Sequence, residues 1–334
     1  MSKISIVIPV HGDCPYLQDT LDSIYNQDFE DFEILIVLDR ASFSTTQLIS
    51  RQNPGIPIRQ IKSETPGIVS ALNLGVENAQ SELIARLDAD DLMMANRLLE
   101  QYNFMINHPE VGCVGSNIML IDEHGNEMYV HRNPKTDRAI KKTLEQRTPL
   151  AHPSVMYRKS IVKALGGYRN FFTYAEDYDL WARMSEVTEM HNLQLELTKY
   201  RVHKDQVSKK RTEIQSLAVL ATRTSIRLRK KGLPDLPDIY SSVEVWAEVN
   251  QVVSNTNESL VNWLKNLFVA QRKNYLKPRW KDLLRTSFQN NRKLGNNFSA
   301  SLIFMTLLII SPLRSTLKFY EWVSFHLVLK NRKS

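Results

Sequence analysis

The sequence predicts an α/β protein in which helices cover both faces of a mostly parallel sheet. Apolar runs of strand length alternate with segments of helical periodicity, and turn-forming residues separate them. The clearest runs are ISIVIPV (residues 4–10), FEILIVLD (32–39) and ELIARLD (82–88). Such near-continuous apolar character is typical of parallel strands that are buried on both sides.

The segments between these runs complete the alternating pattern. Residues 16–27 place Leu17, Leu21 and Ile24 at helical spacing, which predicts a helix directly after the first strand. The same reading predicts helices over 45–52, 67–80 and 94–109. It predicts strands over 58–63, 111–122 and 127–132, the first of them short. From residue 139 to 208 the pattern is mixed.

The charge of the chain is unevenly distributed, which predicts two parts with a boundary after Ser208. Residues 1–208 carry 21 Lys and Arg against 28 Asp and Glu, and residues 209–334 carry 22 against 8. The second part also loses its strand signals and reads as basic helices. Such a tail is expected to face something anionic, either a layer of lipid headgroups or a nucleic acid.

The composition of the tail favours the membrane surface. Its most apolar stretch, Ser299–Leu313, has 15 residues, fewer than the roughly 20 that a spanning helix needs. The segment after it mixes aromatic and aliphatic residues with Lys and Arg, which suits a helix that lies in a membrane interface. The alternative is a helical hairpin that packs on the first part. Residues 222–232 either contact headgroups or form a solvated face.

The cysteines and the first residues of the chain indicate a cytoplasmic setting. Cys14 and Cys113 show neither metal-ligand spacing nor a disulfide framework. The sequence begins MSKISIVI, so strand character starts at once, without the features of a secretory signal. Together with the tail, this predicts a protein on the cytoplasmic face of a membrane.

Three carboxylates follow the third apolar run, at Asp88, Asp90 and Asp91. Ligands of open parallel sheets bind at the carboxyl ends of the strands, where these acids are expected. Closely spaced carboxylates repel one another unless a cation lies between them, and oxygen ligands suit Mg²⁺ or Mn²⁺ with a bound diphosphate. The alternative is a solvated turn in which Asp91 caps the following helix. The chain has no glycine-rich phosphate loop of the GxxxxGK[ST] type.

A second acidic site is expected at FFTYAEDYDLWARM, residues 171–184. Asp177 stands among aromatic residues at a predicted helix start, and partial desolvation there makes it a candidate general base. Thr173 and Glu176 fit a capping box, which explains Glu176 without chemistry. Asp179 and Arg183 are four residues apart and are expected to form a surface pair.

Three further residues stand out, and two of them, Asp39 and His203, each allow two interpretations. Asp39 ends the second apolar run and is either an acceptor for a nucleotide base or an ordinary turn residue. His152 precedes a proline and reads as structural. His203 is either an extra ligand for a divalent metal or an exposed loop residue.

Taken together, these pieces resemble the inverting glycosyltransferases of family 2, which have the GT-A fold. The resemblance covers roughly residues 1–208 and rests on motifs whose order and spacing agree with the family: SIVIPVHG, Asp39, GIVSALNLG, RLDADD, HPSVMYR, GGYR, EDYDLW and YRVHKDQVS. One departure is LDRAS, where the family usually has Asp-Asp-Gly-Ser, because Arg40 can pair with Asp39 or reach a phosphate.

The resemblance implies a donor half over about 1–118, an acceptor half over 119–208, and a role for each matching residue. On the donor side, Pro9 and Val10 would touch the nucleotide through their backbone, Asp39 would face the base, most often uracil, and Arg86 and Asp88 would lie near ribose and diphosphate. For the metal, Asp90 would bind Mn²⁺ or Mg²⁺ and His203 would complete its shell. On the acceptor side, Asp177 would deprotonate the hydroxyl, with His152 and Glu176 beside it.

The implied reaction is inverting transfer of a sugar from a nucleoside-diphosphate donor, most often UDP-linked, to an acceptor hydroxyl. With a membrane-surface tail, the acceptor is expected to be a saccharide, in particular a lipid-linked saccharide of bacterial surface-polysaccharide synthesis. One rival is a sugar-nucleotide nucleotidyltransferase, but the acidic HGDCPYLQD stands where such enzymes carry a glycine-rich basic loop. The other rival is a non-catalytic module that binds nucleic acid or membrane. It leaves the acids unused, and its tail should be more polar, so no nucleic-acid partner is expected.

Overall fold

The computed structural model describes residues 2–239 apart from 53–54, 57 and 204–211. The chain divides into two compact units, of which the first ends at Ile239. The apolar and aromatic segments expected in the tail after residue 298 lie outside the described residues. Among the described residues, no helix is both long and apolar enough to cross a membrane.

A single mixed sheet of nine strands forms the centre of the first unit. Its first half is parallel, as predicted, and runs in the order β3 (Ile58–Lys62), β2 (Phe32–Asp39), β1 (Ile4–His11) and β4 (Leu83–Arg86). The carboxyl ends of β1 and β2 therefore lie side by side, with His11 opposite Asp39.

The second half of the sheet is mostly antiparallel. The short strand β8 (Met156–Arg158) joins β4 to β6 (Val111–Ile121), and it is antiparallel to both. Beyond β6 come β9 (Glu189–Arg201), parallel to β6, and β5 (Leu92–Met93), antiparallel to β9, while β7 (Glu127–His131) pairs with β6. As a result, β5 and the end of β9 meet next to the loop after β4.

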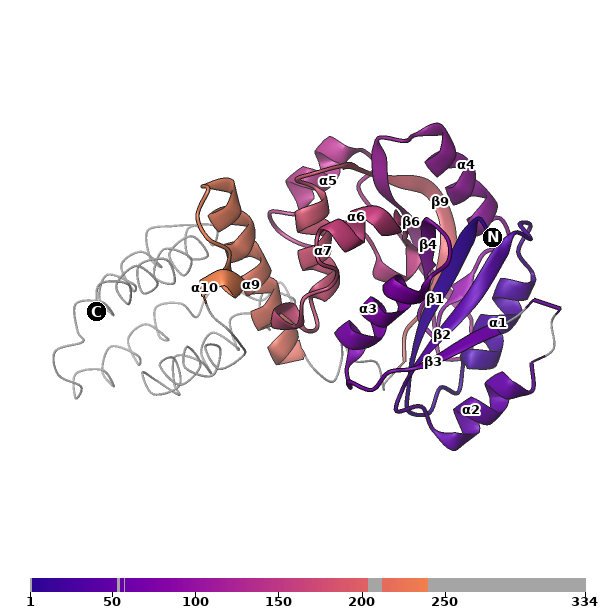
Figure 1. The fold of residues 1–334 in the computed structure, drawn as a ribbon. Coiled ribbons are helices and arrows are strands. Elements are labelled where there is room, and N and C mark those ends of the chain that lie inside the picture. The colour runs from indigo at the N-terminus through magenta and orange to yellow at the C-terminus, as the bar shows by residue number, and fades with distance from the viewer. Residues whose placement is uncertain (1, 53–54, 57, 204–211, 240–334) are drawn as a thin grey trace, which may run out of the picture. The chain divides into compact units, whose positions relative to one another are not determined.

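Helices cover both faces of the sheet, which confirms the predicted α/β class (Figure 1). One face carries α1 (Leu17–Tyr25), α2 (Phe43–Ser50) and α4 (Arg97–Asn107). The other carries α3 (Ile68–Asn78), α5 (Asp137–Thr143), α6 (Lys159–Ala164) and α7 (Glu176–Met184). The short turns η1 (His152–Ser154) and η2 (Asn170–Phe172) precede β8 and α7.

Alternation along β1 explains why its whole sequence is apolar. Ile6 and Ile8 pack toward α1, whereas Val7 packs toward α3. On the α3 side the helix approaches the strand so closely that a Cβ at Gly75 would lie 2.4 Å from the Cγ1 of Val7. Only glycine permits this approach without a shift, and the approach fixes α3 against the sheet beside the ends of β1 and β2.

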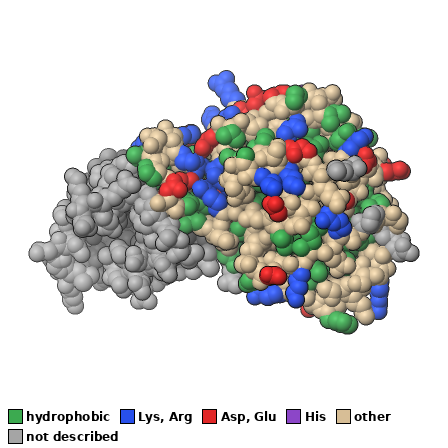
Figure 2. All heavy atoms as spheres, viewed as in Figure 1, with side chains coloured by type: hydrophobic (Ala, Val, Ile, Leu, Met, Phe, Trp, Pro, Cys, Tyr) green, Lys and Arg blue, Asp and Glu red, His purple; other side chains and the backbone are tan. Residues whose placement is uncertain are grey.

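The basic segment after residue 208 begins with a helix that packs on the preceding part of the first unit. Helix α9 (Thr212–Lys230) lies against α7 and η2, and α10 (Leu236–Ile239) follows it. Ile226 and Leu228 of α9 are buried, and Lys230 pairs with Glu145. In Figure 2, Lys and Arg side chains over this region alternate with acidic ones. The segment 222–232 is therefore not simply a solvated face.

The interpretation of Asp179 and Arg183 as a surface pair was wrong, because both side chains are buried. Asp179 also accepts hydrogen bonds from Arg169, and Arg169 pairs in turn with Asp235 at the start of α10. The charges thus form a network between α7 and the segment after α9. A buried carboxylate needs such partners, because an unpaired buried charge is strongly unfavourable.

Candidate active site

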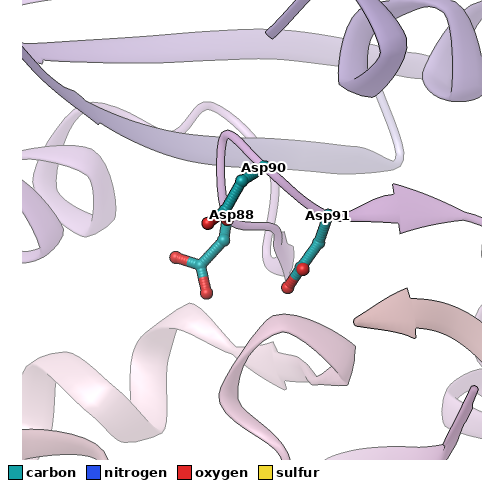
Figure 3. Close-up of side chains that lie close together, drawn as sticks. All are labelled: Asp88, Asp90 and Asp91. Atoms are coloured by element: carbon teal, nitrogen blue, oxygen red, sulfur yellow. The ribbon is translucent and has the colours of Figure 1, made fainter. Parts of the chain in front are cut away.

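The three acids after β4 form a compact cluster in the loop that leads to β5. Figure 3 shows the side chains of Asp88, Asp90 and Asp91 close together. A ligand atom of each lies within 4.8 Å of those of the other two. Asp91 is buried, and the other two are partly exposed. Carboxylate oxygens this close together can bind one cation between them.

Asp88 is held by the last residue of β4. The buried Arg86 guanidinium donates from Nη1 to Oδ2 of Asp88 at 2.5 Å, and its Nη2 lies 2.5 Å from Oδ1. This bidentate geometry is the strongest arrangement that these two groups can adopt. Burial raises the pKa of Asp88, and the charge of Arg86 opposes that rise.

Asp90 contacts the predicted histidine, which lies 113 residues later in the sequence. Nε2 of His203 lies 2.9 Å from Oδ2 of Asp90, and the imidazole ring packs on Tyr16 with 5.3 Å between centroids. The His203 side chain is only 14% exposed. It is therefore not an exposed loop residue, and its role as a metal ligand stays a prediction.

Asp91 does not cap the following helix, contrary to the alternative considered from sequence. Helix α4 begins at Arg97, with β5 in between. Instead, Oδ1 of Asp91 accepts from the backbone N–H of Arg201 at 2.8 Å, while its buried Oδ2 has no partner among the described residues. Burial raises the pKa of Asp91 well above its usual range, and the charge of Asp90 adds to this.

Arg201 is a residue of the site that the sequence interpretation missed. Its guanidinium donates from Nε to the Asp90 carbonyl at 3.0 Å and lies over the Tyr16 ring. The signal was present, because strand alternation places residues 201 and 203 on the same side of an extended chain. Arg201 and His203, two residues apart in the sequence, thus both hold the loop that carries Asp88, Asp90 and Asp91, which we call the acid loop.

These groups fit a divalent cation. Carboxylate oxygens and an imidazole nitrogen are ligands that Mn²⁺ accepts, and Mg²⁺ prefers the oxygens. Oδ2 of Asp91 is a buried acceptor at the cluster, and no residue in the described part of the chain donates to it. A buried acceptor without a partner is costly unless a cation or water completes it.

The ends of β1 and β2 place Asp39 in a set of donors. Oδ2 of Asp39 accepts from the backbone N–H of Gly67 at 3.0 Å and lies 3.1 Å from Nδ1 of His11. Arg40 Nε lies 3.4 Å from the other carboxylate oxygen, so the pairing that LDRAS allows is present. Gly67 has φ 114°, a conformation that favours glycine, and it directs its N–H at the acid just before α3. Pro9 and Val10 lie in β1 immediately before His11.

The second acidic site lies at the start of α7, but the capping box is absent. The N-cap of α7 is Ala175 and no side chain caps it, while Thr173 donates to the carbonyl of Asn170 at 2.6 Å. Glu176 is buried and its Oε2 has no partner among the described residues. Asp177 accepts from the N–H of Tyr178 at 2.7 Å. The acids at this helix start are therefore not explained by capping with side chains.

Burial makes both acids of α7 more basic than free carboxyl groups. It raises the pKa of Asp177 to about 6 and that of Glu176 to about 7. The charge of Arg86 opposes both shifts, which places these acids within electrostatic range of the residue that holds Asp88. The charge of Arg86 thus acts both on Asp88 and on the acids at the start of α7.

His152 packs among buried aromatic side chains, one of which, Trp181, belongs to α7. Its Nε2 lies 3.0 Å from the hydroxyl of Tyr168, and Trp181 contacts the ring edge-on with 5.9 Å between centroids. Burial holds the pKa of His152 well below its usual range, and Arg86 lowers it further. Both effects favour the neutral form of the imidazole, and the ring packs among aromatic side chains as the structural interpretation expects.

The sheet order, the helices on both faces and the acid cluster at the end of β4 define a glycosyltransferase with the GT-A type of fold. The chain is 30% identical to the O-antigen biosynthesis glycosyltransferase WbnJ of Escherichia coli over 69% of its own length and 91% of the relative. The model of glycosyl transferase family 2 matches residues 5–166, and the chain belongs to that family. The rival interpretations as a nucleotidyltransferase or a binding module are thereby set aside.

Two solved structures share the fold at low sequence identity. TarS of S. aureus (residues 1–349), in complex with UDP-GlcNAc, has a TM-score of 0.56 and 16% identity, with 68% of this chain and 66% of that chain covered. The mannosyltransferase PcManGT of Pyrobaculum calidifontis, in complex with GDP-Man and Mn²⁺, has a TM-score of 0.54 and 17% identity, with 92% and 85% covered. At this identity the two structures support the fold alone.

Proposed function

We propose that this enzyme transfers a sugar, with inversion, from a UDP-linked donor to the hydroxyl of a lipid-linked saccharide in bacterial surface-polysaccharide synthesis. The observation that carries the proposal is the contact of His203 with Asp90 beside two further acids at the end of β4. The O-antigen role in the name of the Escherichia coli relative supports the acceptor class.

The donor would bind along the carboxyl ends of β1, β2 and β4. Pro9 and Val10 would contact the nucleotide through their backbone. Asp39 would accept from the uracil base through Oδ1, which accepts no hydrogen bond from the described residues and lies 3.4 Å from Nε of Arg40. Arg86 and Asp88 would lie beside ribose and diphosphate. UDP-GlcNAc in the TarS structure supports this donor class.

Asp90 and His203 would hold Mn²⁺ or Mg²⁺, with Asp88 and Asp91 close by. A divalent ion there would neutralise the charge that grows on the departing diphosphate. The residues themselves prepare the site, because Arg201 binds both the Asp90 carbonyl and, through its N–H, the carboxylate of Asp91. Mn²⁺ in the PcManGT structure supports the choice of metal.

Asp177 would act as the general base. Its carboxylate takes the proton of the acceptor hydroxyl while the hydroxyl oxygen forms a bond to the anomeric carbon. The bond from that carbon to the diphosphate oxygen breaks, and its electron pair leaves with the diphosphate, so the anomeric centre inverts. His152 and Glu176 would line the acceptor side of Asp177.

The proposed organisation keeps catalysis in residues 1–208, with the donor half over about 1–118 and the acceptor half over 119–208. The basic region 209–334 would bring the enzyme to the cytoplasmic face of the membrane, where a lipid-linked acceptor lies. Helix α9 would serve both parts, because it packs on α7 and carries basic residues.

A donor screen tests the proposal. Purified protein would be mixed with individual nucleotide sugars, Mn²⁺ and lipid-linked saccharide acceptors, and nucleoside diphosphate release and glycosylated product would be measured. Release and product formation with a UDP-sugar, both lost on adding a chelator, are the expected result. Turnover of only a non-UDP donor would contradict uracil as the nucleotide base of the donor. Metal-independent turnover would contradict the proposed metal site.

A further inference from the structure

The first residue of α4 is a buried arginine, and its side chain donates hydrogen bonds to neutral acceptors. Arg97 is fully buried, and its guanidinium donates to three backbone carbonyls and to the side-chain oxygen of Gln101. Burying a cation costs several kcal/mol unless its hydrogen bonds compensate, roughly as for other buried ions. An apolar side chain would serve a core position at lower cost, so this arginine calls for an explanation.

The bonds of Arg97 tie together the two ends of the acid loop. Nη2 donates to the carbonyl of Arg86, the last residue of β4, at 2.8 Å. Asp88, Asp90 and Asp91 lie between these two residues in the sequence. The guanidinium of Arg97 thus connects the two ends of the loop that carries the acid cluster. It binds the backbone of Arg86, the residue whose side chain holds Asp88.

The same guanidinium also holds the segment that carries His152. Nη1 donates to the carbonyl of Pro153 at 2.7 Å, and Nη2 donates to that of Val155 at 3.2 Å. One planar group therefore binds the donor side and the acceptor side of the site at once. Lysine could not do this, because its single nitrogen lacks the fixed fork of three nitrogens.

We propose that Arg97 is a positioning residue that fixes the acid loop after β4 relative to the His152 segment and thereby sets the affinity of the acid cluster for its divalent metal. The inference rests on the proposed function, since it takes the cluster to be the metal site. Residues that orient metal ligands without touching the metal commonly change affinity roughly 10- to 100-fold when they are replaced.

Gln101 supplies a matched control one turn further along α4. It is also fully buried, and it donates to the carbonyls of Ser154 at 2.8 Å and Val114 at 3.3 Å. Gln101→Met removes these bonds and one of the four made by Arg97, but leaves both ends of the acid loop tied. This variant therefore shows how far Mn²⁺ affinity falls when buried hydrogen bonds are lost but the two ends of the acid loop stay connected.

The test measures Mn²⁺ binding directly on the full chain, by electron paramagnetic resonance of free Mn²⁺, together with thermal unfolding. We expect Arg97→Met and Arg97→Lys to weaken Mn²⁺ binding by roughly tenfold or more, while Gln101→Met stays within about twofold of the wild type. The lysine variant keeps the buried charge and so remains informative if the methionine variant fails to fold.

The outcomes separate this inference from the proposed function. A wild-type protein that bound no Mn²⁺ would remove the proposed metal site and the inference with it. Wild-type affinity in a folded Arg97→Lys variant, with Mn²⁺ still bound by the parent, would overturn the inference alone. Equal losses of affinity in Arg97→Lys and Gln101→Met would also overturn it, because the effect would then follow from general loosening of the core.

Discussion

Nε2 of His203 lies 2.9 Å from Oδ2 of Asp90, although 113 residues separate them in the sequence. The contact exists because β9 runs back through the sheet beside β6 and ends next to the loop after β4. A histidine and an aspartate at this distance either pair with each other or share a metal ion. We propose the shared ion, and His203 is the residue through which this proposal can be tested.

His203→Ala should weaken Mn²⁺ binding at least as much as the roughly 10- to 100-fold seen when an outer partner of a metal site is lost. The reason is the removal of a ligand together with the group that orients Asp90. Equilibrium binding of Mn²⁺ checks this, with His124→Ala as the control, since the His124 side chain is 76% exposed. Unchanged binding in His203→Ala would leave the histidine as a simple ion-pair partner.

Asp177→Asn should lower the rate of transfer to the acceptor by roughly 10²- to 10⁴-fold, the usual contribution of a general base. Because burial raises the pKa of Asp177 to about 6, kcat/KM of the wild type should rise with pH through that value and then level off. The variant should lack this acidic limb. A pH–rate profile measures both effects.

The matched control for Asp177 is Asp137, which also stands in the first turn of a helix, α5. Asp137→Asn should keep the wild-type profile. If Asp177→Asn retained the wild-type rate and the same acidic limb, another residue would have to be the base.

Glu176→Gln should change how stability depends on pH. Burial raises the pKa of Glu176 to about 7 in the folded protein, above its usual value near 4.5, so the folded state binds the proton more tightly than the unfolded state. The wild type should therefore lose stability as the pH rises from about 4.5 to 7. The variant lacks this loss and should melt a few degrees higher than the wild type at pH 8, with the difference shrinking at pH 4. Thermal melts across this range would contradict the account if the variant were less stable at pH 8.

Asp179→Asn should destabilise the fold by about 3–5 kcal/mol, because it removes the buried counter-charge of Arg183 and one of the two carboxylates that pair with Arg169. Chemical denaturation of the two proteins measures the difference. Glu145→Gln, which removes the exposed partner of Lys230, should cost less than about 1 kcal/mol. Equal small losses in both variants would show that the network between α7 and the segment after α9 contributes little.

The first half of the fold could be predicted because each strand carries its own signal. Residues 32–39 form β2 as the apolar run indicated, and β1 extends the predicted run by one residue to His11. The second half gave weaker signals. Strand β8 has only three residues, and β9 alternates and bends irregularly against β6, so neither shows the continuous run of a parallel core strand.

Part of the site could be predicted from the sequence for a similar reason. Asp88, Asp90 and Asp91 are close neighbours in the sequence, so their side chains lie near one another whatever surrounds the loop. The burial of Asp179 could not be predicted from its spacing to Arg183, because it depends on Arg169 and on the helices after residue 208. Arg97 gave no signal either, since a charged residue at a helix start normally faces solvent.

Anomalous diffraction from a crystal soaked with Mn²⁺ and a UDP-sugar tests the proposed metal site most directly. We expect a manganese peak within bonding distance of Asp90 and Nε2 of His203, with the donor diphosphate on the same ion, and no such peak in Asp90→Asn. Density for the bound donor without manganese at Asp90 in the wild type would contradict the account.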